Sequence, residues 1–218
     1  MSIHPATDQI ATRLHDVRER IAAQGVDPAT VEIVAVTKFH DASTCAAAVA
    51  AGLTTLGENR VQEALSKMDR VAGASWHLIG HLQTNKARSA QRFAMIQSLD
   101  SIRLADTLAE RAPAVPVLVE VNVSGDAEKS GVAVPSALDL VEHAAARLPV
   151  RGLMGMGPRE GDPRPAFRLL RELRERAQDR LGRPLPVLSM GMTQDFEVAV
   201  GEGSTMLRLG TVLFGPRA

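Results

Sequence analysis

The sequence of 218 residues contains no tyrosine, a single tryptophan and a single cysteine. Cys45 therefore cannot form a disulfide within the chain, which argues against a disulfide-stapled secreted protein. The absence of tyrosine removes one of the side chains that enzymes use as a general acid or base. Net charge is absent as well, because 25 basic side chains balance 25 acidic ones. A neutral chain has no overall field that attracts nucleic acid or an anionic membrane.

Long apolar runs and signal patterns are also missing. The alanine-rich stretch from Ala46 to Leu53 is far shorter than the roughly 20 residues of a membrane span. The N-terminus, from Met1 to Pro5, lacks the basic and then apolar pattern of a secretory signal peptide. No linker rich in Pro, Gly or Ser divides the chain, so residues 1–218 are expected to form one domain. We expect a cytoplasmic monomer that binds neither nucleic acid nor membranes.

The pattern of apolar residues predicts a helix followed by alternating strands and helices. Ile10, Leu14, Val17 and Ile21 lie at helical spacing, and Gly25 is a typical stop. Helical patterns also separate eight short apolar runs that are predicted to be strands: Ile33–Thr37, Thr54–Gly57, His77–Gly80, Met95–Leu99, Val117–Val123, Val150–Met156, Pro186–Met190 and Met206–Leu209. Strands that are apolar on both faces, each followed by an amphipathic helix, favour an α/β fold: a single (β/α)8 TIM-type barrel with an extra N-terminal helix. An open doubly wound sheet is the alternative.

Lys38 is the first candidate functional residue, because it directly follows the first predicted strand. Ligands of such barrels bind at the carboxyl ends of the strands, so this amine is expected at the mouth. A lysine that is partly desolvated or lies near another cation can condense with an aldehyde to form a Schiff base. A lysine in this position is more often a solvated charge, so the interpretation depends on the remaining residues.

Glycine, serine and threonine gather after the last two predicted strands, in the segments Ser189–Thr193 and Arg208–Thr211. In eight-stranded barrels these two loops often bind phosphate through backbone N–H groups and hydroxyls. Strands one and eight pair when the barrel closes, which places Lys38 beside this cradle. Pyridoxal 5′-phosphate (PLP) carries both an aldehyde and a phosphate and would bridge the two, with Arg208 facing its ring nitrogen. Turn and helix-cap roles are the alternative for these loop residues.

A series of ordered segments carries a resemblance to a known family: Ala35–Lys38, Gly57–Glu63, Trp76–Gly80, Leu82–Lys86, Lys129–Gly131, Arg151–Met154, Ser189–Thr193, Gly203–Thr211 and Phe214–Gly215. In these segments the chain is similar to the pyridoxal phosphate homeostasis protein family, over nearly its whole length. The sequence departs from the family pattern at two places. Phe39-His40-Asp41 lacks the usual proline after the lysine, and Thr193 stands where serine is usual.

The resemblance implies an alanine-racemase-like barrel that holds PLP as a Schiff base on Lys38. It places Arg208 at the pyridine nitrogen, Asn59 near the ring, and Ser189, Gly210 and Thr211 around the phosphate. His77 is expected inside the barrel, where it is either a ligand contact or a satisfied core histidine. The candidate cofactor-binding residues are Lys38, Asn59, His77, Ser189, Gly191, Arg208, Gly210 and Thr211.

The function that the resemblance implies is binding, buffering and delivery of PLP, with PLP-requiring apo-enzymes as recipients. An amino-acid racemase is the first alternative, but it needs acid/base groups on both sides of the α-carbon. In barrel-type alanine racemases the second group is a tyrosine from another domain, and this chain has neither. Cys45, expected on the first outer helix, and His77 are poorly placed to replace it. A sugar-phosphate aldolase or isomerase is the second alternative, with Glu58 or Glu120 as its carboxylate.

Overall fold

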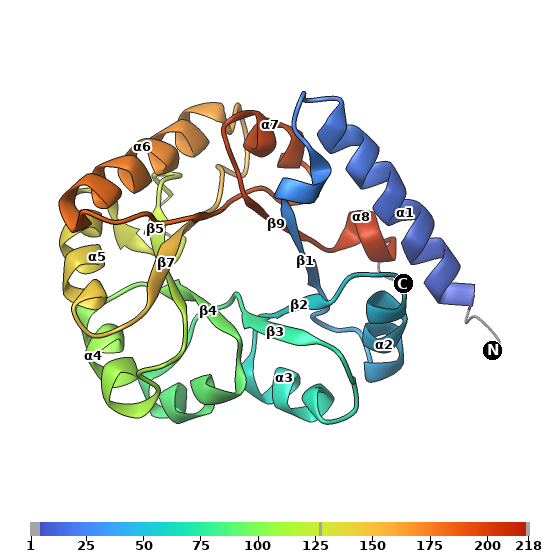
Figure 1. Ribbon diagram of the computed structural model, residues 1–218, viewed down its shortest axis with the longest axis horizontal. Helices are drawn as coiled ribbons and strands as arrows, with labels where there is room; N and C mark the ends of the chain where they lie inside the picture. The colour runs from blue at the N-terminus through green and yellow to red at the C-terminus, as the bar shows by residue number, and fades with distance from the viewer. Residues whose placement is uncertain (1–4, 127, 217–218) are drawn as a thin grey trace.

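The strands of the computed structural model, which describes residues 5–126 and 128–216, close into a parallel barrel (Figure 1). Its eight strands are β1 (Glu32–Val36), β2 (Thr55–Glu58), β3 (Ser75–Leu78), β4 (Met95–Leu99), β5 (Val117–Asn122), β7 (Val150–Gly155), β8 (Val187–Ser189) and β9 (Met206–Leu209). Pairing of β4 with β5 and of β1 with β9 completes the ring. The predicted barrel is therefore confirmed, and the open sheet is not formed.

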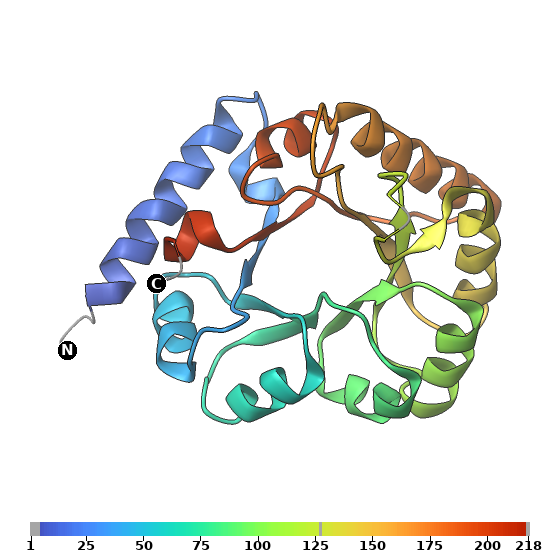
Figure 2. The same ribbon diagram turned by 180° about the vertical axis from the view of Figure 1, so that it is seen from behind.

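Helices surround the barrel on its outside (Figures 1 and 2). They are α1 (Pro5–Ala22), α2 (Ala42–Ala50), α3 (Val61–Met68), α4 (Ile102–Arg111), α5 (Ala137–Ala145), α6 (Arg164–Leu181), α7 (Phe196–Gly201) and α8 (Thr211–Phe214), with short 3-10 helices η1 (Pro28–Thr30) and η3 (Val134–Ser136). The extra N-terminal helix is confirmed as α1, which packs against α2 and α8. None of the helices within the described ranges is both long and apolar enough to cross a membrane.

The regular alternation of strand and α-helix fails in two places. The connection after β3 is the 3-10 helix η2 (Thr84–Arg92), and its buried residues, Ala87 and Ala90, lie three apart, which is the period of a 3-10 helix. The two-residue strand β6 (Val132–Ala133) adds to the edge of β5 outside the ring. Neither feature was predicted, because neither contains an apolar run long enough to be recognised in the sequence.

The interior of the barrel changes from apolar to polar toward its mouth. Val34, Leu118, Met154 and Met206 form an inner apolar cluster. Side chains two residues apart on a strand share a face, so the next inward residues toward the carboxyl ends lie one layer closer to the mouth. Those residues include buried polar side chains, namely Gln97, Glu120, Ser189 and Arg208. This polar layer forms the floor of the candidate site.

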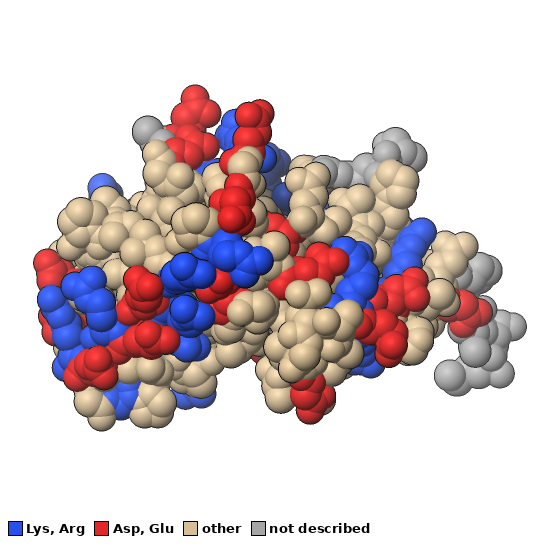
Figure 3. All heavy atoms as spheres, turned by 90° about the horizontal axis from the view of Figure 1, so that it is seen from above, with Lys and Arg blue, Asp and Glu red and all other residues tan. Residues whose placement is uncertain are grey.

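Charges of both signs are interleaved on the outer surface. Figure 3 shows the face over α6, α7 and α1, where Lys and Arg side chains lie beside Asp and Glu. Arg164, Arg168 and Arg171 of α6 contact the buried Glu202 at 3.2, 3.4 and 3.3 Å. The local arrangement agrees with the balanced charge of the whole chain.

Candidate functional site

Lys38 lies two residues beyond the end of β1, at the mouth of the barrel. It lines a small pocket whose other residues are Val36, His40, Gly210, Thr211 and Gly215. The parallel pairing of β1 and β9, with Ala35 opposite Leu209, brings the loops after these strands together. The amine and the Gly210–Thr211 segment therefore share one pocket, in the arrangement expected from strand order.

The loop after β8 packs closely against the same side of the mouth. Gly191 has a φ of 97°, and a Cβ there would lie 2.6 Å from the Cβ of Ala199, so a side chain does not fit. The Thr193 hydroxyl accepts a hydrogen bond from the Val212 N–H at 3.4 Å, which joins this loop to α8. Backbone groups and a threonine hydroxyl of two neighbouring loops thus converge beside the Lys38 pocket.

Arg208 is held rigidly inside the barrel below this loop. One terminal nitrogen, Nη1, donates to the carbonyl and the hydroxyl of Ser189 at 2.9 and 2.8 Å, and Nη2 donates to the carbonyl of Gly155 at 2.9 Å. Its side chain is almost fully buried, and this burial lowers the pKa of Arg208 to about 10. The guanidinium therefore remains charged at neutral pH.

A buried amide connects Arg208 to His77. Gln97 Oε1 accepts a hydrogen bond from the Ser189 hydroxyl at 2.7 Å, and Gln97 Nε2 lies 3.0 Å from His77 Nδ1. Burial lowers the pKa of His77 to about 4, so the imidazole is neutral at pH 7 and accepts the amide hydrogen at Nδ1. The prediction that His77 lies inside the barrel is confirmed. Gln97 was missed, although a glutamine within the apolar run Met95–Leu99 was a visible signal.

The neutral state of His77 should make folding stability depend on pH. An unfolded histidine has a pKa near 6.5 and folded His77 one near 4, so the unfolded chain binds more protons in this window and stability falls as pH falls through it. Between about pH 7.5 and about pH 5 we expect this group to remove about 2 kcal/mol from the free energy of unfolding. Urea unfolding at the two pH values measures how much the free energy of unfolding falls. The fall should be about 2 kcal/mol smaller in His77→Gln than in the wild-type protein. Equal losses in both proteins would contradict the assignment.

The two carboxylates considered as catalytic groups, Glu120 and Glu58, form hydrogen bonds with other side chains. Glu120 is buried in the barrel and accepts a hydrogen bond from the Ser130 hydroxyl at 2.5 Å; burial raises its pKa, and the charge of Arg208 opposes that rise. Glu58 is also fully buried, but its Oε1 contacts Lys67 on α3 at 2.8 Å, outside the barrel wall. Glu58 does not line the Lys38 pocket.

The structure also places two other residues considered from the sequence, Asn59 and Cys45. Asn59 directly follows β2, and its backbone packs so closely on Gly80 that a Cβ at Gly80 would overlap the Asn59 carbonyl. The loops after β2 and β3 are therefore held together beside the mouth. Cys45 lies on α2, the helix that follows β1, as expected, and it is fully buried.

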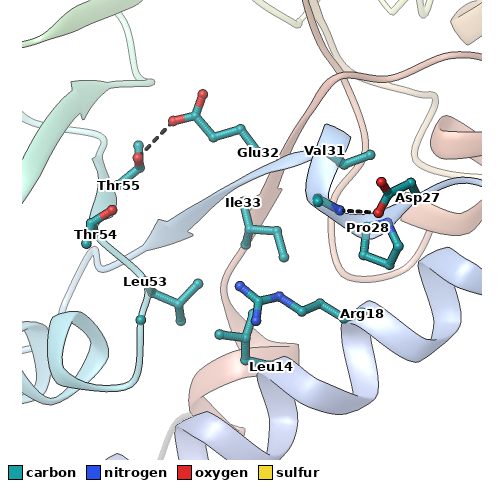
Figure 4. Close-up of a pocket in the computed structure, with 12 residues that line it drawn as sticks. Leu14, Arg18, Asp27, Pro28, Val31, Glu32, Ile33, Leu53, Thr54 and Thr55 are labelled. Carbon is teal, nitrogen blue, oxygen red and sulfur yellow. Dashed lines mark hydrogen bonds between the residues drawn. The ribbon is translucent and has the colours of Figure 1, made fainter.

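A larger pocket, of about 560 Å³, lies at the opposite end of the barrel (Figure 4). It is bordered by Arg18 of α1 and by the first residues of β1 and β2. Glu32 accepts a hydrogen bond from the Thr55 hydroxyl at 2.8 Å, and Asp27 caps η1 through the Ala29 N–H at 2.9 Å. Residues at the amino ends of barrel strands generally serve stability. The carboxyl-end pocket with Lys38 is therefore the better candidate despite its smaller size.

Comparison with known proteins decides the family. Residues 6–218 match the family model of the alanine racemase N-terminal domain. The pyridoxal phosphate homeostasis protein of Pseudomonas aeruginosa is 41% identical, over 96% of this chain and 95% of that protein. The chain belongs to the pyridoxal phosphate homeostasis protein family.

Solved structures agree with this family assignment. PipY of Synechococcus elongatus, solved with PLP bound, is 32% identical with a TM-score of 0.82, over 94% of this chain and 100% of that chain. Alanine racemase of Corynebacterium glutamicum is 15% identical with a TM-score of 0.78, over 96% of this chain and 61% of the racemase. At that identity the likeness shows the fold alone, which this homeostasis-family protein shares with the barrel of the racemase.

Proposed function

We propose that this protein binds PLP as a Schiff base on Lys38 and holds the cofactor for use elsewhere, as a PLP homeostasis protein. The observation that carries the proposal is that Lys38, Gly210 and Thr211 line one pocket. An amine and an anion cradle in one pocket match the aldehyde and the phosphate arm of PLP, which are carried by adjacent carbons of its ring. The name of the Pseudomonas aeruginosa relative and the PLP bound to PipY support the same ligand.

Lys38 is the covalent attachment point in this proposal. Its amine attacks the aldehyde carbon, a C=N bond forms in place of C=O, and the oxygen leaves as water. When bound, PLP supplies a reactive aldehyde and an aromatic ring that withdraws electrons. The chain supplies the position: Lys38 is partly buried at the end of a rigid strand, with Val36 beside it as an apolar wall.

The phosphate end is assigned to Gly191, Thr193, Gly210 and Thr211. Gly191 and Gly210 let the backbone approach an anion closely, and the two threonines offer hydroxyl groups. Ser189 was also expected around the phosphate. Its hydroxyl is fully buried and already bonded to Gln97 and Arg208, so we assign it to positioning Arg208.

The ring end is assigned to Arg208 and Asn59. The three bonds that Arg208 makes to Ser189 and Gly155 use three of its five N–H donors, which leaves others for the ring nitrogen. A permanent positive charge there disfavours protonation of the ring and makes it a weaker electron sink. His77 acts through Gln97 on Ser189 rather than on the ligand.

A carrier fits the chain better than a racemase or a sugar-phosphate enzyme. Among the described residues that line the Lys38 pocket, His40 is the other titratable side chain, and its ring contacts that of Phe214 in a tilted arrangement at 4.5 Å between centroids. Tyrosine is absent from the chain, and Glu58 is bonded on the outer side of the barrel. We further propose that the protein acts as a cytoplasmic monomer and passes PLP to apo-enzymes that require it.

Hydrogen exchange at the α-carbon of amino acids tests the carrier assignment. The PLP-loaded protein is incubated with L-alanine or D-alanine in heavy water, and deuterium at the α-carbon and the enantiomer ratio are followed by NMR. Because Lys38 supplies one acid/base group and racemisation needs two, we expect exchange with inversion no more than about tenfold faster than with free PLP. Sustained exchange with inversion well above that rate would establish a racemase instead.

A further inference from the structure

The two peptide groups that flank Lys38 are both held by one cluster of charged side chains, of which Glu58 and Lys67 are buried and Glu63 is partly buried. Lys67 Nζ donates to the carbonyl of Thr37 at 3.0 Å. Glu63 Oε1 accepts from the N–H of Phe39 at 2.6 Å, and the same oxygen lies 2.8 Å from Lys67 Nζ. These peptide groups lie immediately before and after the α-carbon of Lys38, so its backbone is fixed from both sides.

Glu58 ties this cluster to the barrel wall. Its Oε1 accepts from Lys67 Nζ at 2.8 Å and from the Thr37 hydroxyl at 2.6 Å, at the last residue of β2. Lys67 and Glu63 come from α3, the helix that follows β2. The second strand-helix unit of the barrel therefore clamps the loop that carries Lys38.

The conformation of Phe39 shows why such a clamp is needed. It has a φ of 69° and is the non-glycine residue at positive φ among the residues that the structure describes. This backbone region is strained for a residue that carries a side chain. Phe39 is 66% exposed, so burial of its ring offsets little of that strain. Two observed hydrogen bonds hold the turn: the His40 N–H donates to the carbonyl of Thr37 at 3.0 Å, and the Phe39 N–H donates to Glu63.

Burying charged side chains costs folding stability, so a role in positioning Lys38 explains the cluster better than a gain in stability does. Burial disfavours the Lys67 ammonium, but the hydrogen bonds to Glu58 and Glu63 outweigh burial and raise the pKa of Lys67. Its three N–H donors match the three acceptors around it. Glu58 Oε2 is buried without a hydrogen-bond partner in the described part of the chain. Well-packed apolar residues often stabilise a protein as much as a buried ion cluster does.

We propose that Lys67 is a positioning residue. Together with Glu63 and Glu58, it orients the Lys38 amine toward the aldehyde of PLP. The inference rests on the proposed function, because the cluster would place the amine that forms the Schiff base. Lys67 does not line the Lys38 pocket and acts through the backbone on either side of Lys38.

Lys67→Met tests the role, because it keeps most of the length of the side chain and removes its three donors. The first readout is amide hydrogen exchange of the cofactor-free protein at Phe39, which should speed up by about tenfold or more once the turn is released. The second readout is the ratio of the affinities for PLP and for pyridoxine 5′-phosphate, which has an alcohol in place of the aldehyde. We expect the preference for PLP to fall by about tenfold, while pyridoxine 5′-phosphate affinity stays within about twofold.

Two further variants make the test specific. Glu63→Gln keeps an acceptor for the Phe39 N–H but loses the charge that binds Lys67. The exchange rate at Phe39 and the preference for PLP should therefore change in the same direction as in Lys67→Met, but by less. Arg180→Met breaks surface contacts to Asp139 and Glu142 and should leave both readouts at the wild-type values. A role limited to general stability would lower the affinities for both ligands together. If Lys67→Met does not fold, Glu63→Gln provides the same two readouts.

The outcomes separate this inference from the proposed function. Unchanged exchange at Phe39, or faster exchange with an unchanged preference for PLP, overturns the positioning role. A wild-type protein that shows no preference for PLP over pyridoxine 5′-phosphate overturns the Schiff base instead. The exchange rates of the cofactor-free variants then still decide whether Lys67 holds the turn.

Discussion

Lys38→Ala should lose all covalent attachment of PLP and, with it, the visible absorbance band of the Schiff base. Its affinity for pyridoxine 5′-phosphate should stay within about threefold of wild type, a change below about 1 kcal/mol. The reason is that the substitution removes the amine and leaves Gly191, Gly210 and Thr211 in place. Absorbance titration with PLP and calorimetric titration with pyridoxine 5′-phosphate measure the two effects separately.

Lys86→Ala is the matched control for this experiment. Lys86 lies in η2 and donates a hydrogen bond to Gln62 at 3.0 Å, away from the Lys38 pocket. It should keep the full absorbance band. A band that persists in Lys38→Ala would assign the Schiff base to another lysine. Complete loss of pyridoxine 5′-phosphate binding in Lys38→Ala would mean that the anion site is not the one described.

Arg208→Met should lower the free energy of unfolding by about 3–5 kcal/mol, the usual range for removing one partner of a buried charged network. The substitution leaves the carbonyls of Ser189 and Gly155 without their donor and removes the positive charge of Arg208 that favours the ionised form of the buried Glu120. Urea unfolding of the cofactor-free protein at neutral pH measures the effect without relying on any ligand.

Arg208→Lys is the control that separates charge from hydrogen bonding. It keeps the positive charge, but an ammonium cannot reproduce the planar arrangement that reaches Ser189 and Gly155 at once. Its loss of stability should fall between those of wild type and Arg208→Met. A loss below about 1 kcal/mol in Arg208→Met is the size expected of an exposed charge, and it would contradict the buried network.

Strand positions were predictable because the physical signal for them is local. The bounds of β4 and β9 agree with the apolar runs Met95–Leu99 and Met206–Leu209, since strands of a closed parallel barrel are apolar on both faces. The predicted start of β3 at His77 was late by two residues, because Ser75 is polar and only partly buried. The helix η2 was not predicted as such, because its sequence is strongly polar and buries only two small residues, Ala87 and Ala90.

The place of the site was predictable from strand order, but its supporting contacts were not. Lys38 and Gly210 share a pocket because the first and last strands of a closed barrel must pair, and that follows from topology. Gln97 and Lys67 make their contacts with side chains brought together by folding. A sequence shows that Gln97 interrupts an apolar strand, but it does not show which partners it will meet.

The attachment of PLP to Lys38 is the claim on which the account depends, and intact mass measured before and after borohydride reduction tests it most directly. Borohydride reduces the C=N bond to a stable amine, so the reduced protein should keep the mass of PLP under denaturing conditions. Peptide mapping should place that mass on the segment containing Lys38. A reduced protein without added mass, or with the mass on a different lysine, would contradict the account.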